Sequence, residues 1–287
     1  MKKLNTIIDL KKASLDKNGI WVTDIKLGKD VSISKEAWEN IYNFNLDELR
    51  KDKKDFIDNK LKDHISYIKD TYKFNEKTIY LEIGCGPAHI GEYLMEKHDV
   101  TFVGVDFNYP MLLSLQAHLK EKGFKKYILI HSDITKMPIL GDSIDYIYGG
   151  GVIEHMSDTL GILKELRRVL RKDGVVFNTI PAFNLFWLSR FYNNIPYNPI
   201  LKSFFEYVHI KILKGEILKK YYGYELSYTL KQLYKLHRSL KFQNITQKPF
   251  AFYPSEKKVK NKLLRRLCYK ISLNSFTSPV YCVYAKK

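Results

Sequence analysis

The strongest constraint on the fold is a regular alternation of apolar runs and helical patterns between residues 78 and 182. Such alternation is typical of a parallel sheet with helices on both faces. The expected strands are TIYLEI, VTFVGVD, KYILIHS, SIDYIYG and VVFNTI, with KFQNIT and SPVYCVYAK later in the chain. The expected helices are His89–Lys97, Pro110–Lys122 and Asp158–Arg171. The sequence therefore predicts an α/β fold with a seven-stranded, mostly parallel sheet.

Two segments do not follow this alternation. Residues 1–75 carry apolar side chains at helical spacing, which predicts an N-terminal helical extension. Residues 183–226 are rich in aromatic residues and are interrupted by Gly, Pro and Asn, which predicts a helical lid inserted beside the sheet. Residues 76–182 and 227–287 are then the two parts of the core. The apolar residues of the extension are Phe56, Ile57, Leu61, Ile65 and Ile68.

The composition is that of a globular protein. The chain has 287 residues, of which 45% are hydrophobic, and this is enough for one large core. Its three cysteines, Cys85, Cys268 and Cys282, have no C-x-x-C spacing, so neither a disulfide scaffold nor a zinc cluster is expected. The first residues contain too short an apolar run for a signal peptide, and no run of about twenty apolar residues occurs. These features predict a cytoplasmic protein.

The formal net charge of +17 has two interpretations. A strongly basic chain can bind nucleic acid, an anionic membrane surface or a phosphorylated substrate. The chain is also rich in Lys, Ile, Asn and Tyr, and a bias in the coding DNA can produce such a composition without any role for the charge. The sequence does not decide between these two interpretations.

A bare loop follows the first predicted strand, in the stretch LEIGCGPAHIG. Gly84 and Gly86 have no side chains, so a ligand can come close to the backbone, and the next helix presents its N-terminal amides to the same place. The spacing does not fit a dinucleotide site, because His89 stands where G-x-G-x-x-G has its third glycine. The G-K-[ST] ending of a nucleotide-triphosphate loop is absent as well.

Three acidic residues end three successive strands: Glu82, Asp106 and Asp133. The carboxyl ends of parallel strands meet at one edge of a sheet, so these residues are expected to line a ligand crevice. Glu82 would repel a pyrophosphate and attract an amino group, and Asp106 can accept from both hydroxyls of a ribose. Asp133 can accept from an adenine amino group, with Ile134 against the ring, or it can cap the turn that follows. S-adenosylmethionine combines an amino-acid end, a ribose and an adenine.

Residues 78–182 resemble the class I S-adenosylmethionine-dependent methyltransferases, and five ordered motifs carry the likeness. They are LEIGCGPAHIG, VGVDFNYPML, HSDITKMPI, DSIDYIYGGGVIEHM and ELRRVLRKDGVVFNTIP. The resemblance implies a Rossmann-like fold and S-adenosyl-L-methionine as cofactor. Ala88 departs from the pattern where many members have a third glycine, and Asp173 departs where a proline is common. The implied cofactor site consists of Glu82, Gly84, Cys85, Gly86, Asp106, Phe107, Asp133, Ile134 and Gly149.

The stretch GGGVIEH carries the candidate catalytic residues, Glu154 and His155. It resembles an arrangement in family members that methylate quinol precursors and related small molecules. A hydroxyl acceptor needs a base to take its proton, and histidine is suited to this near neutral pH. The alternative is that His155 caps the helix or orients a loop. Glu154 is expected to orient His155, and no metal is predicted, because a lone Glu-His pair is a poor cation site.

The candidate substrate contacts lie in the aromatic lid and are Phe183, Trp187, Tyr192 and Tyr222. As a group, the lid aromatics predict a pocket for a flat or greasy molecule. The lid also carries lysines, and this mixture suits a membrane interface or single-stranded nucleic acid. Nucleic acid is the less favoured partner, because the sequence contains no recognisable RNA-binding module. The basic segment 255–270 predicts a solvated helix face, with contact to lipid or phosphate groups as the alternative.

The sequence thus predicts a methyltransferase of a small or lipid-like molecule, acting at oxygen by in-line displacement. Peripheral contact with an anionic membrane or with phosphate groups is an additional expectation, and no oligomeric state is predicted. Two alternatives stay open. One is an RNA or protein methyltransferase, and the other is a catalytically silent scaffold with the same fold.

Overall fold

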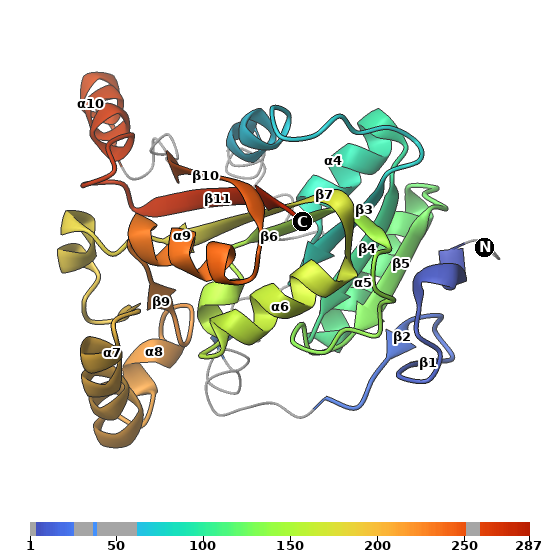
Figure 1. Ribbon diagram of the computed structural model, residues 1–287, viewed down its shortest axis with the longest axis horizontal. Coiled ribbons are helices and arrows are strands. Elements are labelled where there is room, and N and C mark those ends of the chain that lie inside the picture. Colours follow the sequence, from blue (N-terminus) through green and yellow to red (C-terminus); the bar gives the residue numbers. More distant parts are fainter. Residues whose placement is uncertain (1–3, 26–36, 39–61, 251–258) are drawn as a thin grey trace.

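The computed structural model describes residues 4–25, 37–38, 62–250 and 259–287, and its centre is one mixed β-sheet (Figure 1). Seven of its strands are those predicted from the sequence, so the α/β fold class is confirmed. They are β3 (Ile79–Ile83), β4 (Thr101–Asp106), β5 (Tyr127–His131), β6 (Ile144–Gly150), β7 (Leu170–Pro181), β10 (Gln243–Phe250) and β11 (Val280–Lys286).

The sheet is parallel through its middle. Within the described residues the strand order is β1-β2-β5-β4-β3-β6-β7-β11-β10, and β11 runs antiparallel to both of its neighbours. The chain adds β4 and β5 on one side of β3 and then returns to add β6 and β7 on the other side. The carboxyl ends of β3 and β6 therefore meet at a topological switch point, where open α/β sheets bind their ligands.

The N-terminal segment adds two strands that the sequence did not predict. β1 (Ser14–Leu15) and β2 (Trp21–Val22) form a small hairpin, and β2 pairs parallel with β5, with Trp21 opposite Ile130. In the described part of the chain the sheet has nine strands rather than seven. A strand of two residues is too short to give a recognisable period, which is why the prediction of a purely helical extension was incomplete.

Part of the predicted helical extension is present. Residues 62–68 are helical, and Ile65 and Ile68 are buried in the same apolar cluster as Tyr80 of β3. Phe56, Ile57 and Leu61 lie outside the described residues. The apolar spacing therefore predicted the helix correctly where the structure describes it.

Helices cover both faces of the sheet. α4 (His89–His98) and α5 (Tyr109–Glu121) pack on one face, whereas α6 (Thr159–Val169) and α9 (Leu230–Ser239) pack on the other. Figure 1 shows α6 and α9 in front of the sheet and α4 behind it. Thr229 is the N-cap of α9 and forms a capping box with Gln232.

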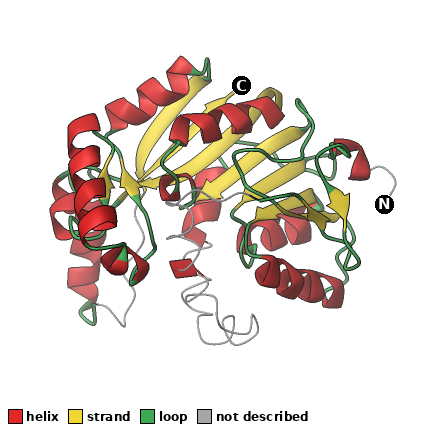
Figure 2. Cartoon of the chain, turned by 90° about the horizontal axis from the view of Figure 1, so that it is seen from below, coloured by secondary structure: helices red, strands yellow, loops and turns green. Residues whose placement is uncertain are grey.

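Residues 183–226 form a separate layer at one end of the sheet (Figures 1 and 2). Ala182 bridges Tyr228, and the Phe183 amide donates to the Tyr228 carbonyl at 2.8 Å, so the lid begins where β7 ends. This attachment places the lid beside the carboxyl end of β7. Its elements are η3 (Leu185–Ser189), β8 (Ile195–Pro196), α7 (Pro199–Glu206), the π-helical η4 (Tyr207–Ile212), α8 (Glu216–Lys219) and β9 (Leu226–Ser227).

One further helix, α10 (Lys262–Ser272), lies between β10 and β11 and projects beyond the end of the sheet (Figure 1). In the part of the chain that the structure describes, none of the helices combines the length and the hydrophobicity needed to cross a bilayer.

We expect the buried His237 of α9 to make the protein less stable in mild acid. Its ring is fully buried, packs on Phe242 and donates from Nδ1 to the Leu233 carbonyl at 2.8 Å. Burial lowers its pKa to about 4, from an ordinary value of 6.5, so between these values the unfolded chain binds more protons than the folded one. The free energy of unfolding should therefore fall by about 2 kcal/mol from neutral pH to about pH 5 because of this residue.

Denaturant unfolding of the native chain and of His237→Leu at the two pH values measures this contribution. The variant should lose less stability on acidification than the native chain. The same pH dependence in both chains would contradict the assignment.

Candidate functional site

The loop after β3 allows close approach to the backbone. Gly84 and Gly86 have φ angles of 54° and 45°, a region that residues with a Cβ rarely adopt. Ala88 also has a positive φ, 49°, immediately before α4. The Cys85 amide donates to the Val105 carbonyl at 3.1 Å, which holds the loop against the end of β4. Gly84 is exposed at the switch point, so the loop can present bare main chain to a ligand.

Glu82 lies under this loop, near the end of β3, and is only 6% exposed. Its Oε2 accepts from the Gly91 amide at 3.0 Å and from the Tyr80 hydroxyl at 3.1 Å. Gly91 belongs to the first turn of α4, where an amide has no partner within the helix. Glu82 therefore anchors the helix N-terminus, in addition to the ligand contact that the sequence predicted.

Asp106 ends β4 and is also almost completely buried. Its Oδ2 accepts from the Gly86 amide and its Oδ1 from the Asn108 amide, both at 2.8 Å. This carboxylate therefore fixes the glycine loop of the neighbouring strand as well as its own. The predicted ribose contact and the loop geometry depend on the same side chain.

Burial makes both carboxylates costly to ionise. It raises the pKa of Glu82 to about 8, against the opposing effect of the bonds from Tyr80 and Gly91, and the charge of Asp106 adds to the rise. Burial also raises the pKa of Asp106, although the amides of Asn108 and Gly86 lower it. A ligand that brings positive charge and hydroxyl donors to this place would stabilise the charged forms.

Asp133 follows β5 and is half-buried. Its Oδ1 accepts from both the amide and the hydroxyl of Thr135, each at 2.8 Å, which is the local capping role considered from the sequence. These bonds use one carboxylate oxygen, so capping is compatible with a contact to adenine. Ile134 is packed in the apolar core, and Phe107 is half-buried, with its carbonyl 3.0 Å from His131 Nε2.

The loop after β6 lies against the glycine loop. A Cβ on Gly84 would come within 2.9 Å of Val152 Cγ2, so the loops after β3 and β6 are in contact. Gly151 has a φ of 74°, which favours glycine at this turn. Burial raises the pKa of the Cys85 thiol, so this residue in the loop is a neutral packing group.

His155 is buried in the short 3-10 turn η2 after this loop, and the neighbouring Glu154 is buried as well. Its Nδ1 donates to the Tyr224 carbonyl at 2.7 Å, which ties the ring to the lid. Burial lowers the pKa of His155, while the carbonyls of Tyr224 and Gly151 act in the opposite direction. The imidazole is therefore neutral near pH 7. The carbonyl oxygens of Tyr224 and Gly151 would stabilise the ring if it gained a proton.

A charged pair in the lid also acts on this ring. Arg190 Nη2 lies 3.2 Å from Glu225 Oε2, and Asn194 Nδ2 donates to the same oxygen at 3.0 Å. The charge of Glu225 raises the pKa of His155, and that of Arg190 lowers it. The protonation of His155 is therefore coupled to the lid as well as to the sheet.

The predicted substrate residues separate into three places. Tyr222 lies beside Trp38, with ring centroids 5.8 Å apart, and Trp38 meets His155 edge-on at 5.5 Å. Phe183 and Trp187 pack on each other at 5.1 Å. Tyr192 pairs with Tyr221 and Phe191 instead. Of the four predicted residues, only Tyr222 has a described ring contact that leads to His155.

Two residues near the site were missed by sequence reasoning. Trp38 lies in the N-terminal region, where no motif distinguishes it. Asn178 of β7 is opposite Gly149 of β6 and has no exposed surface. Among the described residues neither its Oδ1 nor its Nδ2 has a hydrogen-bond partner. A Cβ on Gly149 would lie 2.4 Å from Asn178 Oδ1, so the amide fills the space that this glycine leaves. The asparagine within the largely apolar run VVFNTI was the available signal.

Comparison with known proteins agrees with this geometry. A family model described as a methyltransferase domain matches residues 81–178, which run from β3 to β7 and include Glu82, Asp106 and His155. Residues 81–178 carry a methyltransferase domain, and the fold is that of class I S-adenosylmethionine-dependent methyltransferases. This match confirms the family, the enzyme class and the cofactor, S-adenosyl-L-methionine, that were predicted from the sequence.

Individual relatives are distant. The demethylmenaquinone methyltransferase of Anoxybacillus flavithermus is 26% identical over 206 residues, which cover 67% of this chain and 82% of that protein. The malonyl-[acyl-carrier protein] O-methyltransferase of Legionella pneumophila is 33% identical over 103 residues, 35% of each chain. Among solved structures, phosphoethanolamine N-methyltransferase 2 of Haemonchus contortus with S-adenosyl-L-methionine has a TM-score of 0.53 and 16% identity. That comparison covers 78% of this chain and 51% of the other, and it concerns the fold alone.

The residues of the methyltransferase domain fit this cofactor. The buried carboxylates of Glu82 and Asp106 suit an ammonium group and a pair of hydroxyls, and the bare loop around Gly84 suits a ligand that approaches the main chain. Asp133, at the end of the third strand, can serve the adenine. These groups follow the carboxyl edge of β3, β4 and β5 in order.

We expect Asp106→Asn to weaken the binding of S-adenosylmethionine by about 1–3 kcal/mol, because a charged hydrogen-bond acceptor is lost. Isothermal titration with S-adenosylmethionine measures the change. The matched control is Asp99→Asn, which removes one exposed charge from the other end of α4, where asparagine tolerates the positive φ. Equal affinities of Asp106→Asn and the control would contradict the predicted role.

We expect Asn178→Val to stabilise the fold while it slows methyl transfer. A buried amide without a partner costs about 1–3 kcal/mol, and valine removes that cost. Because the amide lies at the carboxyl ends of β6 and β7, its loss should reduce turnover. Denaturant unfolding and a methyl-transfer assay measure the two effects. Asn194→Val is the control, since its amide is paired with Glu225 and its loss should destabilise the lid. A variant that is more stable and fully active would show that Asn178 has no functional role.

Proposed function

We propose that the chain transfers the methyl group of S-adenosylmethionine to a small or lipid-like acceptor, at an oxygen atom. The observation that supports this most is a group of three neighbouring rings beside the loop after β6, those of His155, Trp38 and Tyr222. The neutral imidazole of His155 lies there with Trp38 edge-on to it, and Tyr222 follows. Flat aromatic walls suit a flat or greasy acceptor, and a neutral imidazole suits an acceptor that must lose a proton.

When bound, S-adenosylmethionine would supply an electrophilic methyl group, with a neutral thioether as the leaving group in line with the acceptor. The protein itself positions the cofactor and the acceptor, and it excludes water from the site. The loops after β3 and β6, which touch at Gly84 and Val152, fix the backbone on both sides of the switch point. Asp106 holds the first loop through the Gly86 amide, so the position of the cofactor is set before the acceptor arrives.

His155 takes the proton of the acceptor hydroxyl in this proposal. The Tyr224 carbonyl orients the ring through Nδ1, and the backbone oxygens of Tyr224 and Gly151 stabilise the ring when it becomes positive. The lid covers His155 and excludes water, which strengthens these interactions. Since the bond to Tyr224 joins the catalytic ring to the lid, an ordered lid and an oriented base go together.

The names of the relatives support a small acceptor over RNA. One relative is a demethylmenaquinone methyltransferase, and another is an O-methyltransferase of malonyl-[acyl-carrier protein]. The first name favours a lipid-like acceptor and the second favours transfer to oxygen. The chain spans only 35% of the second protein, so its acceptor is an analogy for this chain.

The test is to incubate the protein with methyl-labelled S-adenosylmethionine and separate lipid, RNA and protein fractions of a cell extract. We expect the label to enter the organic phase, and nuclear magnetic resonance of the product should show a methyl group on oxygen. A label on carbon or nitrogen would overturn the assignment to oxygen. Label in RNA or protein alone, or in no fraction although the cofactor binds, would overturn the proposal itself.

We expect His155→Gln to lower kcat for the labelled acceptor by about 10²-fold or more, with cofactor affinity nearly unchanged. The neutral ring is the active form, so the native rate should rise with pH through the lowered pKa of His155 and then become constant. The variant should lose this rise. A variant that keeps the same pH profile at a lower rate would show that His155 only positions the loop and the lid.

A further inference from the structure

The amphipathic helix α10 has its apolar side turned away from the protein. Leu263, Leu264, Leu267 and Ile271 follow helical spacing, and they are 75%, 49%, 52% and 49% exposed. A surface helix of a globular protein normally packs such a stripe against the core. None of the residues of α10 is buried, and the positions turned toward the protein are instead Arg265, Cys268, Tyr269 and Ser272, which are partly covered.

The charges of α10 have one sign. Lys262, Arg266 and Lys270 are exposed along the helix, and residues 259–273 contain no acidic residue. A water-facing helix that needed only solubility would not need an exposed leucine stripe as well. Cations bordering exposed leucines complement a surface that is negatively charged outside and apolar beneath.

The apolar surface continues from α10 onto the lid. Phe276, in the turn after α10, is 69% exposed, and its carbonyl accepts from the Leu185 amide of η3 at 3.1 Å. Leu185 and Leu188 of η3 are 64% and 63% exposed. Asn184 Nδ2 donates to carbonyls at both ends of the same turn, Ser275 and Ser278, each at 2.9 Å. Helix, turn and lid are therefore joined, and Figure 1 shows them at the same end of the molecule.

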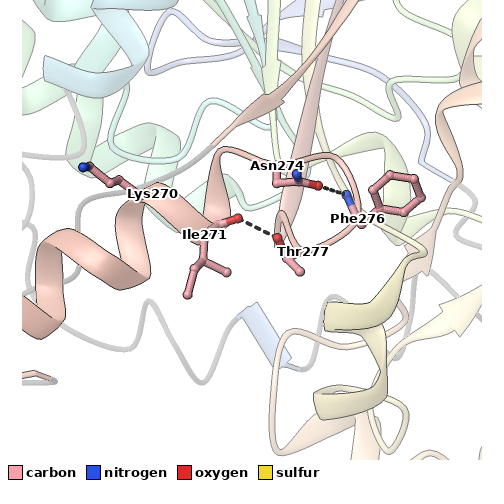
Figure 3. Close-up of a pocket in the computed structure, with 5 residues that line it drawn as sticks. All are labelled: Lys270, Ile271, Asn274, Phe276 and Thr277. Carbon is pink, nitrogen blue, oxygen red and sulfur yellow. Dashed lines mark hydrogen bonds between the residues drawn. The ribbon is translucent and has the colours of Figure 1, made fainter.

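An open pocket of about 450 Å³ lies in this surface (Figure 3). It is lined by Lys270, Ile271, Asn274, Phe276 and Thr277, and Figure 3 shows the Lys270 ammonium group extending away from the Phe276 ring. The Phe276 amide donates to Asn274 Oδ1 at 2.8 Å, which fixes the turn that carries the phenylalanine.

We propose that this surface docks the protein onto an anionic phospholipid bilayer. The docking face consists of Leu263, Leu264, Leu267, Ile271, Phe276, Leu185 and Leu188, bordered by Lys262, Arg266 and Lys270. The apolar side chains enter the interface, and the cations contact lipid phosphates. The inference goes beyond the proposed function and stands without it, because it rests on exposure and charge rather than on the methyl-transfer site. It also brings the lid, which carries the acceptor contacts, next to the lipid surface.

The test is co-sedimentation of the full chain with phosphatidylcholine vesicles, with and without phosphatidylglycerol, in the absence of cofactor and acceptor. We expect binding to the phosphatidylglycerol vesicles that weakens with salt, and much weaker binding to phosphatidylcholine alone. Two double variants probe the face. Leu267→Ser with Ile271→Ser removes apolar contacts, and Arg266→Gln with Lys270→Gln removes charges. Each should lower the affinity for anionic vesicles about tenfold or more.

The controls carry the same chemical changes elsewhere. Leu160→Ser changes an exposed leucine of α6, and Lys231→Gln with Lys235→Gln removes two exposed charges from α9. Both controls should bind vesicles like the native chain, and all variants should keep native cofactor affinity, which shows that they fold. The proposal would be overturned if the native chain did not bind anionic vesicles, or if the two double variants of the docking face bound them as well as the controls do.

Two other occupants give distinct results. If a second copy of the chain covers the face, the native protein should dimerise, the leucine variants should be monomeric, and vesicle binding should be absent. If the face binds RNA instead, the native chain should bind an RNA oligonucleotide and not the anionic vesicles, and the charge variant should lose RNA binding. Either result replaces the bilayer proposal. Vesicle binding with the methyl label in RNA or protein alone, or in no fraction, would leave docking intact and overturn only the proposed function.

Discussion

The site depends on two carboxylates that the fold buries side by side at the ends of β3 and β4. Glu82 and Asp106 are each only 6% exposed, and backbone amides from the glycine loop and from α4 hold them there. Burial raises the pKa of both groups, so the free protein keeps these charges at a cost. A cationic ligand with hydroxyl donors offsets that cost, and a phosphate-bearing ligand would increase it. The predicted cofactor contacts and the shape of the loop therefore depend on the same two carboxylates.

The sequence predicted this part well, because each step depends on short-range rules. Period and length identified the seven core strands, and acids at the ends of successive strands must meet at one edge of a parallel sheet. Gly84 and Gly86 have the positive φ angles for which glycine is needed.

Other parts depend on contacts between distant segments, for which one sequence gives little information. β2 is recognisable only through its pairing with β5, and Trp38 reaches His155 across more than a hundred residues of chain. Asn178 is an ordinary polar residue until its register with Gly149 is known. The amphipathic pattern of α10 was visible, but amphipathicity alone does not tell which side of a helix faces the protein. That orientation decides between a solvated cationic face and an exposed apolar one.

The lid connects these elements and explains why they occur together. It begins at the end of β7, holds the ring of His155 through the Tyr224 carbonyl, and meets the turn after α10 through Asn184. The lid therefore contacts both the proposed docking face and the ring proposed as the base. Contact with a surface and orientation of His155 can therefore favour the same arrangement of the lid. If they do, a lipid surface orders the site at the moment when an apolar acceptor is within reach, and the site remains less ordered in its absence.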